Sequence, residues 1–482
     1  MAAHHTPPLI LAALLAACSS EVWDHTTTSG ATEGSSSSSS GTGGSASSSS
    51  GTGGGPKCSA SQLAGCVCPD EPGAAWARTF NEPSGLEAIV PWMAGTLPIA
   101  SDGSTVLLLA TDVFDENAGA FDQRPTRFVK LDAAGQILWD QPTDGIASPT
   151  PDPNGCSTVV TGAIELGTTQ VLGHMVSCST AHCPFAARLD AGGAPVWIKV
   201  FDFGGDAWTA PQIAGVLADG RIALVGPFHQ GSVDLGNGPL SAPQSGVFVA
   251  MLSPSGDALW SRHLAKEQWT PAFAVAVLSA AGDITVATRP GGAVDFGDGP
   301  VPEPGASVPG GLVLASYDPS GALRFGNIVA SPSPMLGCVL ARDAAGDLIL
   351  GVHTYGSADF GGGPLSDDAG ETLSAVVVFD AEGNHLWDTV VGDLPLSALA
   401  ADAAHHVWVG GGNDGLIELG PSGALIATHP FSGQGTRFAS AIGFTPSGSP
   451  VIAGGFKGTI DLGQGPLVAL GSRDTFVAKL AP

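Results

Sequence analysis

The chain has 482 residues and a formal net charge of −27, although only 13% of its residues are charged. This acidity argues against nucleic-acid binding, which needs clustered Lys and Arg, and against docking on anionic lipid head groups. The 69 glycines and 37 prolines supply turn residues many times over, which favours an all-β fold over a helical one.

Residues 1–17 have the pattern of a secretory signal peptide. The apolar run Leu9–Ala17 is too short to span a bilayer, and it leads into the sequence LAAC, which ends at Cys18. This segment resembles the bacterial lipobox, and the resemblance implies that Cys18 is lipidated and becomes the new N-terminus. It departs from the usual pattern because no Lys or Arg precedes Leu9; an ordinary cleaved signal peptide without a lipid is the alternative. Because Ser19 rather than Asp follows the cysteine, the resemblance implies sorting to the outer membrane of the cell envelope.

Residues 18–56 are expected to form a disordered tether. Its main part, Thr26–Gly55, is almost wholly Ser, Thr and Gly, so no burial can offset the entropy lost on ordering. Such a linker has a mean reach of roughly 30 Å, which would hold a domain just off a membrane surface. The membrane, contacted through the lipid on Cys18, is therefore one expected partner.

Residues 57–74 form a cysteine-containing connector, and residues 75–482 form the main domain. Export implies an oxidising compartment, where disulfides are the default. The sequence leaves their connectivity open, and metal ligation is the alternative, although no Cys-x-x-Cys pair has a matching second pair. Cys338 lies in an apolar stretch and is expected to be a buried cysteine outside any disulfide. The candidate disulfide cysteines are Cys58, Cys66, Cys68, Cys156, Cys178 and Cys183.

An internal repeat is the strongest signal in the chain. Its clearest copy reads FVKLDAAGQILW over Phe128–Trp139: an alternating strand, a tight turn that contains Gly, and a second strand that carries an aromatic residue. Seven copies recur at intervals of roughly 40 to 65 residues. The aromatic positions are expected to pack between neighbouring repeats, with cofactor stacking as the alternative. The other copies are Phe248–Trp260, Val376–Trp387, weaker copies that end at Trp197 and Phe325, Leu416–Ala427, and the partial copy Phe476–Leu480.

A second repeated element places an Asp between apolar residues, before Gly-x-Gly-Pro. The simpler interpretation is a strand end at which the carboxylate caps the amides of the turn. The alternative is a Ca²⁺ loop, although each copy offers one consistent carboxylate and Ca²⁺ takes six to eight oxygen ligands. The four aspartates are Asp234, Asp295, Asp359 and Asp461.

Four strands per repeat with hairpin connections predict the blades of a β-propeller. The last copy stops before its aromatic strand, and the segment that begins at Trp76 has the pattern of that missing strand. The sequence therefore predicts an all-β, seven-bladed propeller, monomeric, whose N-terminal strand closes the last blade. Closure would also remove exposed sheet edges.

The repeats resemble the bacterial propeller repeat called SBBP and, more distantly, the quinoprotein-type repeat. The residues that carry this resemblance are the Phe-Val-Ala-Lys-Leu strand, the turn glycine and the Trp position. In that family these positions are structural, and no motif here maps onto the quinoprotein cofactor site, so no cofactor is expected.

No catalytic constellation is evident: the chain has no credible nucleophile elbow, His-Glu-x-x-His motif or P-loop. His405 and His406 are adjacent, and neighbouring side chains of a strand point to opposite faces, so they cannot easily share one metal. The sequence favours a non-enzymatic binding or scaffold module whose partner is an unidentified protein or glycan. The alternatives are a propeller-type enzyme (hydrolase, lactonase or quinoprotein-like) and a structural component of the envelope.

Overall fold

Every element of the described chain is a β-strand, numbered β1 to β37 in chain order, which confirms the all-β prediction. The described part contains no helix long and apolar enough to cross a bilayer. Cys18, Cys58, Cys66 and Cys68 lie outside the described residues, as do the signal peptide and the tether. The structure, a computed structural model, describes residues 74–80, 87–89, 95–115, 120–143, 146–205, 211–266, 274–289, 293–297, 300–301, 311–329, 335–366, 372–392, 396–412, 415–470 and 474–481.

Most strands belong to a repeated four-stranded antiparallel meander, called a unit below and named by its first and last strands. Alternation of apolar side chains makes the strands, and glycine-containing turns reverse the chain between them. The strands of the β2–β6 unit are β2 (Glu87–Ile89), β4 (Thr105–Asp115), β5 (Ala120–Leu131) and β6 (Ile137–Thr143). Those of the β7–β10 unit are β7 (Ile146–Pro151), β8 (Thr158–Val171), β9 (His174–Leu189) and β10 (Pro195–Val200). Those of the β12–β15 unit are β12 (Gln212–Val216), β13 (Ile222–Asp234), β14 (Pro239–Leu252) and β15 (Ala258–Lys266).

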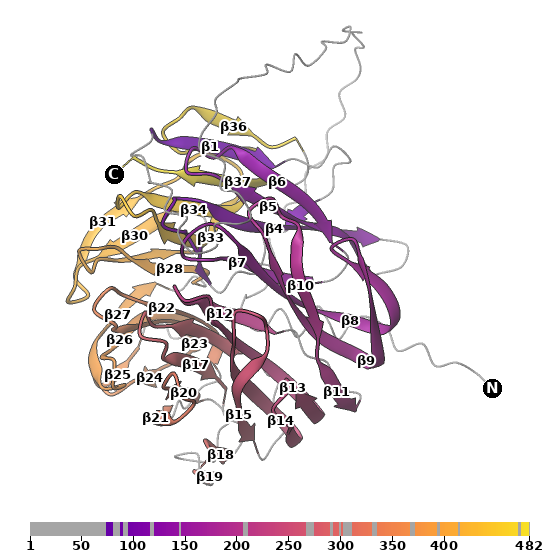
Figure 1. Cartoon of the computed structure of the whole chain (residues 1–482). Coiled ribbons are helices and arrows are strands. Elements are labelled where there is room, and N and C mark those ends of the chain that lie inside the picture. Colours follow the sequence, from indigo (N-terminus) through magenta and orange to yellow (C-terminus); the bar gives the residue numbers. More distant parts are fainter. Residues whose placement is uncertain are drawn as a thin grey trace, which may run out of the picture.

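The same meander continues through the second half of the chain (Figure 1). The β16–β21 unit contains β16 (Ala274–Leu278), β17 (Ile284–Thr288), β20 (Leu312–Tyr317) and β21 (Leu323–Val329). The β22–β27 unit contains β22 (Met335–Arg342), β23 (Leu348–Tyr355), β26 (Thr372–Phe379) and β27 (His385–Gly392). The β28–β31 unit contains β28 (Ala398–Ala401), β29 (Val407–Gly410), β30 (Leu416–Leu419) and β31 (Leu425–His429).

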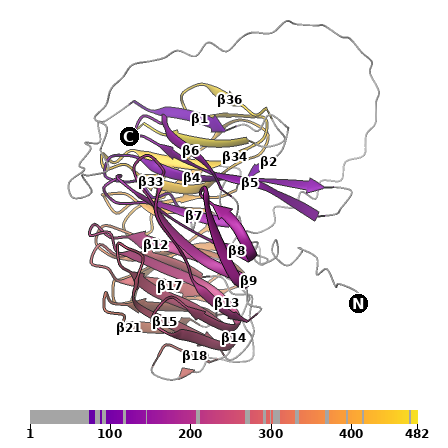
Figure 2. The ribbon, with the colours of Figure 1, turned by 45° about the vertical axis from the view of Figure 1, so that its right-hand side comes forward.

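One further unit takes its strands from both ends of the chain. It contains β33 (Arg437–Phe444), β34 (Pro450–Phe456), β37 (Asp474–Lys479) and β1 (Trp76–Phe80) in that order, and is called the β33–β1 unit. β1 runs antiparallel to β37, with Trp76 opposite Lys479, and Figures 1 and 2 show indigo β1 beside the yellow C-terminal strands. The N-terminal strand therefore lies on the sheet where the repeat pattern placed it. At the other edge, the short strand β3 (Gly95–Thr96) runs parallel to β33.

Some of the short strands outside the meanders connect neighbouring units through backbone hydrogen bonds, whereas β24 and β25 pair only with each other. β18 pairs with β15 of the preceding unit, β11 pairs with β13 of the following unit, and β32 pairs with β35. Besides β3, the short strands outside the meanders are β11 (Asp202–Gly205), β18 (Val294–Asp295), β19 (Pro300–Val301), β24 (Ala358–Asp359), β25 (Pro364–Leu365), β32 (Ser432–Gln434), β35 (Thr459–Asp461) and β36 (Pro466–Val468).

Consecutive units pack face to face, and the core is divided into clusters that each lie between two neighbouring units. One cluster joins the two ends of the series: Leu107 and Val129 of the β2–β6 unit pack with Val451 and Val477 of the β33–β1 unit. Full burial of one such side chain contributes about 1.5–3 kcal/mol. A series of four-stranded sheets stacked face to face is the architecture of a β-propeller.

The repeated aromatic residue lies directly on a turn glycine of the next unit. Gly321 has a φ of +83°, and a methyl group added there would meet the ring of Trp260 at 2.7 Å. Trp260 Nε1 also donates a hydrogen bond of 2.9 Å to the carbonyl of Pro319 in the same turn. The expected packing of the aromatics between neighbours is therefore confirmed. The other pairs are Trp76 on Gly135, Trp139 on Gly193, Trp197 on Gly256, Phe325 on Gly383 and Trp387 on Gly423.

The β28–β31 unit is the exception, because Ala427 occupies the aromatic position. Ala427 lies opposite Glu418, just as Trp260 lies opposite Met251 in its own unit. The next unit, β33–β1, has no turn between its third and fourth strands, because β37 and β1 come from opposite ends of the chain. An aromatic residue at position 427 would therefore have no turn glycine to cover.

The contact between aromatic and glycine can be tested with a pair of matched substitutions. Gly448 has a φ of +86° with nothing within 4 Å of an added methyl group, so Gly448→Ala should lower the free energy of unfolding by about 1 kcal/mol through backbone strain alone. Gly321→Ala adds overpacking against Trp260 and should cost about 1–3 kcal/mol more. Denaturant unfolding of both variants measures the difference, and equal losses would contradict the contact.

Candidate functional site

The two ends of a unit present different surfaces. In a four-stranded meander, the connections between the first two strands and between the last two strands lie at the same end. In the five units from β7–β10 to β28–β31 both are tight turns; in one of them the amide of Gly321 donates a 2.9 Å hydrogen bond to the carbonyl of Asp318. This is called the turn end. The opposite end, called the hairpin end, carries the connections between second and third strands and those between units.

The hairpin of β8 and β9 extends beyond its own unit at the hairpin end. β7 pairs with β8 only as far as Ala163, and β10 pairs with β9 only as far as Phe185, whereas β8 and β9 stay paired to the tip. Leu166 and Met175 on this extension are 66% and 68% exposed. The hairpin therefore presents large apolar side chains to the surroundings.

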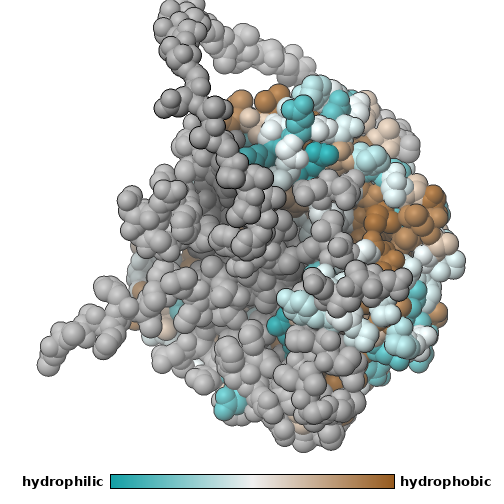
Figure 3. All heavy atoms as spheres, turned by 180° about the vertical axis from the view of Figure 1, so that it is seen from behind, coloured by the Kyte–Doolittle hydropathy of each residue, from teal (hydrophilic) through white to brown (hydrophobic). Residues whose placement is uncertain are grey.

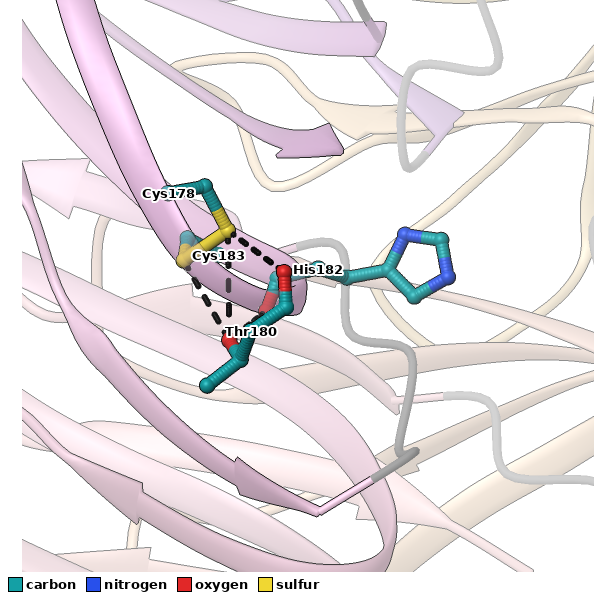
Figure 4. Close-up of a disulfide and its surroundings, with 4 residues drawn as sticks. All are labelled: Cys178, Thr180, His182 and Cys183. Atoms are coloured by element: carbon teal, nitrogen blue, oxygen red, sulfur yellow. Dashed lines mark hydrogen bonds between the residues drawn. A yellow bond between two sulfur atoms is a disulfide. The ribbon is translucent and has the colours of Figure 1, made fainter. Parts of the chain in front are cut away.

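A disulfide between Cys178 and Cys183 closes a bulge in this hairpin (Figure 4). The two cysteines lie on the same strand, and the register of β8 and β9 shifts between them, so residues 179–181 have no partner opposite. Inside the bulge, Thr180 Oγ1 donates a 3.0 Å hydrogen bond to the carbonyl of His182. The covalent link fixes the bulge and hence the direction of the hairpin beyond it.

The other cysteines are placed differently. Cys156, a third candidate in the same unit, forms no disulfide within the described residues. Cys338 also forms none there and is only 2% exposed, so its expected burial is confirmed.

The four repeated aspartates each close a hairpin in the same way. Each lies opposite the Pro five residues later. In one example, Oδ1 of Asp359 accepts hydrogen bonds from the amides of Gly361 and Gly363 at 2.8 and 3.1 Å. Asp234 and Asp461 each accept the equivalent two bonds from the glycine amides two and four residues later, and Asp295 accepts a bond from the amide of Gly297.

The contacts of these aspartates are those of a turn cap. The four carboxylates belong to four separate hairpins, and within the described residues none is part of a group of three or more metal-ligating side chains. Calcium binding by Asp234, Asp295, Asp359 and Asp461 stays a prediction of the sequence.

A cluster of histidines and carboxylates lies in the β28–β31 unit. His406 Nδ1 lies 2.9 Å from Glu418 Oε1 and 3.4 Å from Asp402 Oδ2. His429 Nε2 contacts the other oxygen of Glu418 at 3.0 Å, and Trp408 Nε1 donates to Asp402 Oδ2 at 3.3 Å. The polar cluster is defined as Asp402, His406, Glu418 and His429. The side chains of Asp402, His406 and Glu418 are 18%, 29% and 13% exposed, so all three are largely withdrawn from solvent.

Local structure explains how these side chains meet. The turn between β28 and β29 brings Asp402 to His406, and Asp402 Oδ1 accepts a 2.9 Å hydrogen bond from the backbone amide of His406. Glu418 enters from β30. His429 lies at the end of β31 and stacks on Trp408 with a centroid separation of 4.6 Å and an interplanar angle of 19°.

His405 takes no part in the polar cluster. Its Nδ1 lies 2.6 Å from Oδ2 of Asp343 in the preceding unit, and this contact raises the pKa of His405 above its ordinary value. The two adjacent histidines therefore serve different contacts. Both lie in the turn before β29, and His405 has a φ of +63°, so the turn and not strand alternation separates their side chains. The histidine pair alone does not indicate the cluster in the sequence, because the carboxylates that meet His406 come from the turn and from β30.

No protein-family model matches the chain, and no curated protein sequence matches it either. Among solved structures, the chain is similar to the Dos1 propeller, with a TM-score of 0.42, 10% identity, and coverage of 82% of this chain and 78% of that one. It is also similar to the polysaccharide lyase Uly1 (TM-score 0.45, 9% identity, 80% and 89% coverage). A third is the quinohemoprotein alcohol dehydrogenase of Comamonas testosteroni (TM-score 0.37, 10% identity, 84% and 76% coverage). Resemblance at this level carries no information on activity.

Proposed function

We propose that the described sheets are the blades of one closed, seven-bladed ring. The contacts between the β33–β1 and β2–β6 units repeat those between other neighbours. Trp76 Nε1 donates a 2.9 Å hydrogen bond to the carbonyl of Ala133, and its ring covers Gly135. The shared hydrophobic cluster of these two units supports the same interpretation.

This ring would be held at the outer membrane by a lipid on Cys18, with residues 18–56 as the tether. The support is the signal-peptide pattern, the cysteine at its end and the Ser/Thr/Gly composition that follows. The strongly acidic chain would not need to approach anionic head groups, because the lipid supplies the attachment.

The displayed ring would act as a non-catalytic binding module that contacts a protein or glycan through its hairpin end. The observation that carries this proposal is the β8–β9 hairpin, which projects beyond its unit, is fixed by a disulfide and exposes Leu166 and Met175. Exposed apolar side chains on a rigid loop are typical of contact surfaces. Figure 3 shows hydrophobic patches among neutral and hydrophilic residues on the described part of one face.

Replacing Cys18 tests the membrane attachment. Cys18→Ser removes the sulfur to which the lipid would be joined, so the protein should move from the membrane fraction to the soluble fraction. Cys156→Ser is the control, since it removes another cysteine while leaving the lipid in place. Fractionation followed by immunoblotting reads the result, and a Cys18→Ser variant that stays with membranes would refute the anchor.

The binding surface can be tested with two matched double variants. Leu166→Ser with Met175→Ser changes the hairpin end, and Ile137→Ser with Leu138→Ser changes two side chains at the turn end that are 44% and 52% exposed. The full chain, immobilised, is used to capture envelope proteins and glycans. We expect a partner that the hairpin variant loses at least tenfold and the turn-end variant retains. Capture of nothing, or equal capture by both variants, would rule out this surface.

A further inference from the structure

We propose that the polar cluster of the β28–β31 unit binds one divalent transition-metal ion, best matched by Zn²⁺. The ligands are Asp402, His406 and Glu418, and a solvent molecule completes the coordination. His429 and Trp408 are positioning residues. This site is separate from the hairpin end and does not depend on the proposed binding function.

The spacing of the ligand atoms already suits a metal ion. With metal–ligand distances of about 2.1 Å, two adjacent ligand atoms lie about 3.0 Å apart at a right angle and about 3.4 Å apart at the tetrahedral angle. The observed separations from His406 Nδ1 are 2.9 Å to Glu418 and 3.4 Å to Asp402. All three ligand atoms lie within 4.8 Å of one another, so they are close enough to converge on one ion.

The charge of the cluster also favours a cation. Asp402 and Glu418 bring two carboxylates into a partly buried position, and within the described residues only histidines form ion pairs with them. Partly buried carboxylates that lack a permanent cation repel each other and lose hydration. One divalent ion would neutralise both.

Each ligand carboxylate is held by a further group, as in metal sites whose outer contacts orient the ligands. Oδ1 of Asp402 accepts the amides of Ala404 and His406, and its Oδ2 accepts Trp408 Nε1. The second oxygen of Glu418 is held by His429, whose ring is fixed by stacking on Trp408. A nitrogen and oxygen donor set of this kind suits Zn²⁺, Co²⁺ or Ni²⁺ better than Ca²⁺ or Mg²⁺, which prefer oxygen ligands alone.

The position of the cluster in the fold gives it a structural use. The β28–β31 unit has Ala427 where other units place an aromatic residue, and thus lacks the contact that holds each of those units to the next. His429, two residues beyond Ala427, turns back onto its own unit, whereas Arg262, two residues beyond Trp260, donates to the carbonyl of Gly321 in the next one. A metal ion would connect the β28–β29 turn to β30 and strengthen this unit from within.

The test measures Zn²⁺ binding to the full chain by isothermal titration calorimetry, together with the visible absorption of the Co²⁺-loaded protein. We expect His406→Gln and Glu418→Gln each to lose one equivalent of Zn²⁺ and the corresponding Co²⁺ bands. Trp408→Phe removes the donor to Asp402 while keeping an aromatic ring beside His429, and should weaken binding about 10- to 100-fold. His405→Asn is the matched control and should bind as the wild type does, because Asn tolerates the φ of +63° at this position.

Comparison with His406→Gln separates this site from any other Zn²⁺ bound by the chain. Equal numbers of equivalents in the wild type and in His406→Gln would overturn the proposal. So would displacement of Zn²⁺ by an equal concentration of Ca²⁺. If His406→Gln fails to fold, Glu418→Gln and Trp408→Phe decide the question by the same readouts.

Discussion

The structure depends on one repeated contact, in which an aromatic ring covers the glycine of a turn in the next unit. Only glycine permits this approach, because the turn needs a positive φ and a β-carbon would occupy the space of the ring. An aromatic side chain buries about 150–250 Å², which corresponds to a hydrophobic contribution on the order of 4–6 kcal/mol when burial is complete. At Trp76, Trp197 and Trp260 the indole N–H adds direction, since it donates to a carbonyl of the same turn; Nε1 of Trp139 is buried without such a bond within the described residues. The contact thus sets both the distance and the register between neighbouring sheets.

The same contact explains why the repeat is irregular at one place. The sheet that combines β37 with β1 has no turn between these strands, so the preceding unit has nothing for an aromatic residue to cover and carries Ala427 instead. At the junction between the β28–β31 and β33–β1 units, Trp408 packs edge-on against Phe444 of β33 and stacks on His429, which contacts a carboxylate of the polar cluster. Ala427 therefore departs from the repeated sequence pattern at the point where the following sheet lacks the turn found in the other units. The proposed metal site lies in the same unit as Ala427.

Much of the fold could be predicted from the sequence because its signals are local and repeated. The strand–turn–strand pattern around Trp139 and Trp260 identifies the sheets, and the incomplete last copy indicates that Trp76–Phe80 pairs with the C-terminal strand, as β1 does. The pairing of Cys178 with Cys183 could not be chosen, because sequence spacing left several connectivities open and the bulge that brings the two together depends on the register of β8 and β9. The polar cluster was missed because its members come from a turn and two strands. Two signals could have pointed to it: the Ala at the aromatic position and a His two residues later.

The central claim is that the two ends of the chain complete one ring through Trp76. The most direct measurement compares thermal unfolding of Trp76→Ala with that of Trp197→Ala, since both indoles are partly buried, cover a turn glycine and donate to a turn carbonyl. If the ring is closed, the two variants should lower the unfolding midpoint by similar amounts, each reflecting a loss of about 3–5 kcal/mol. A Trp76→Ala protein that melts with the wild type, while Trp197→Ala is destabilised, would contradict closure.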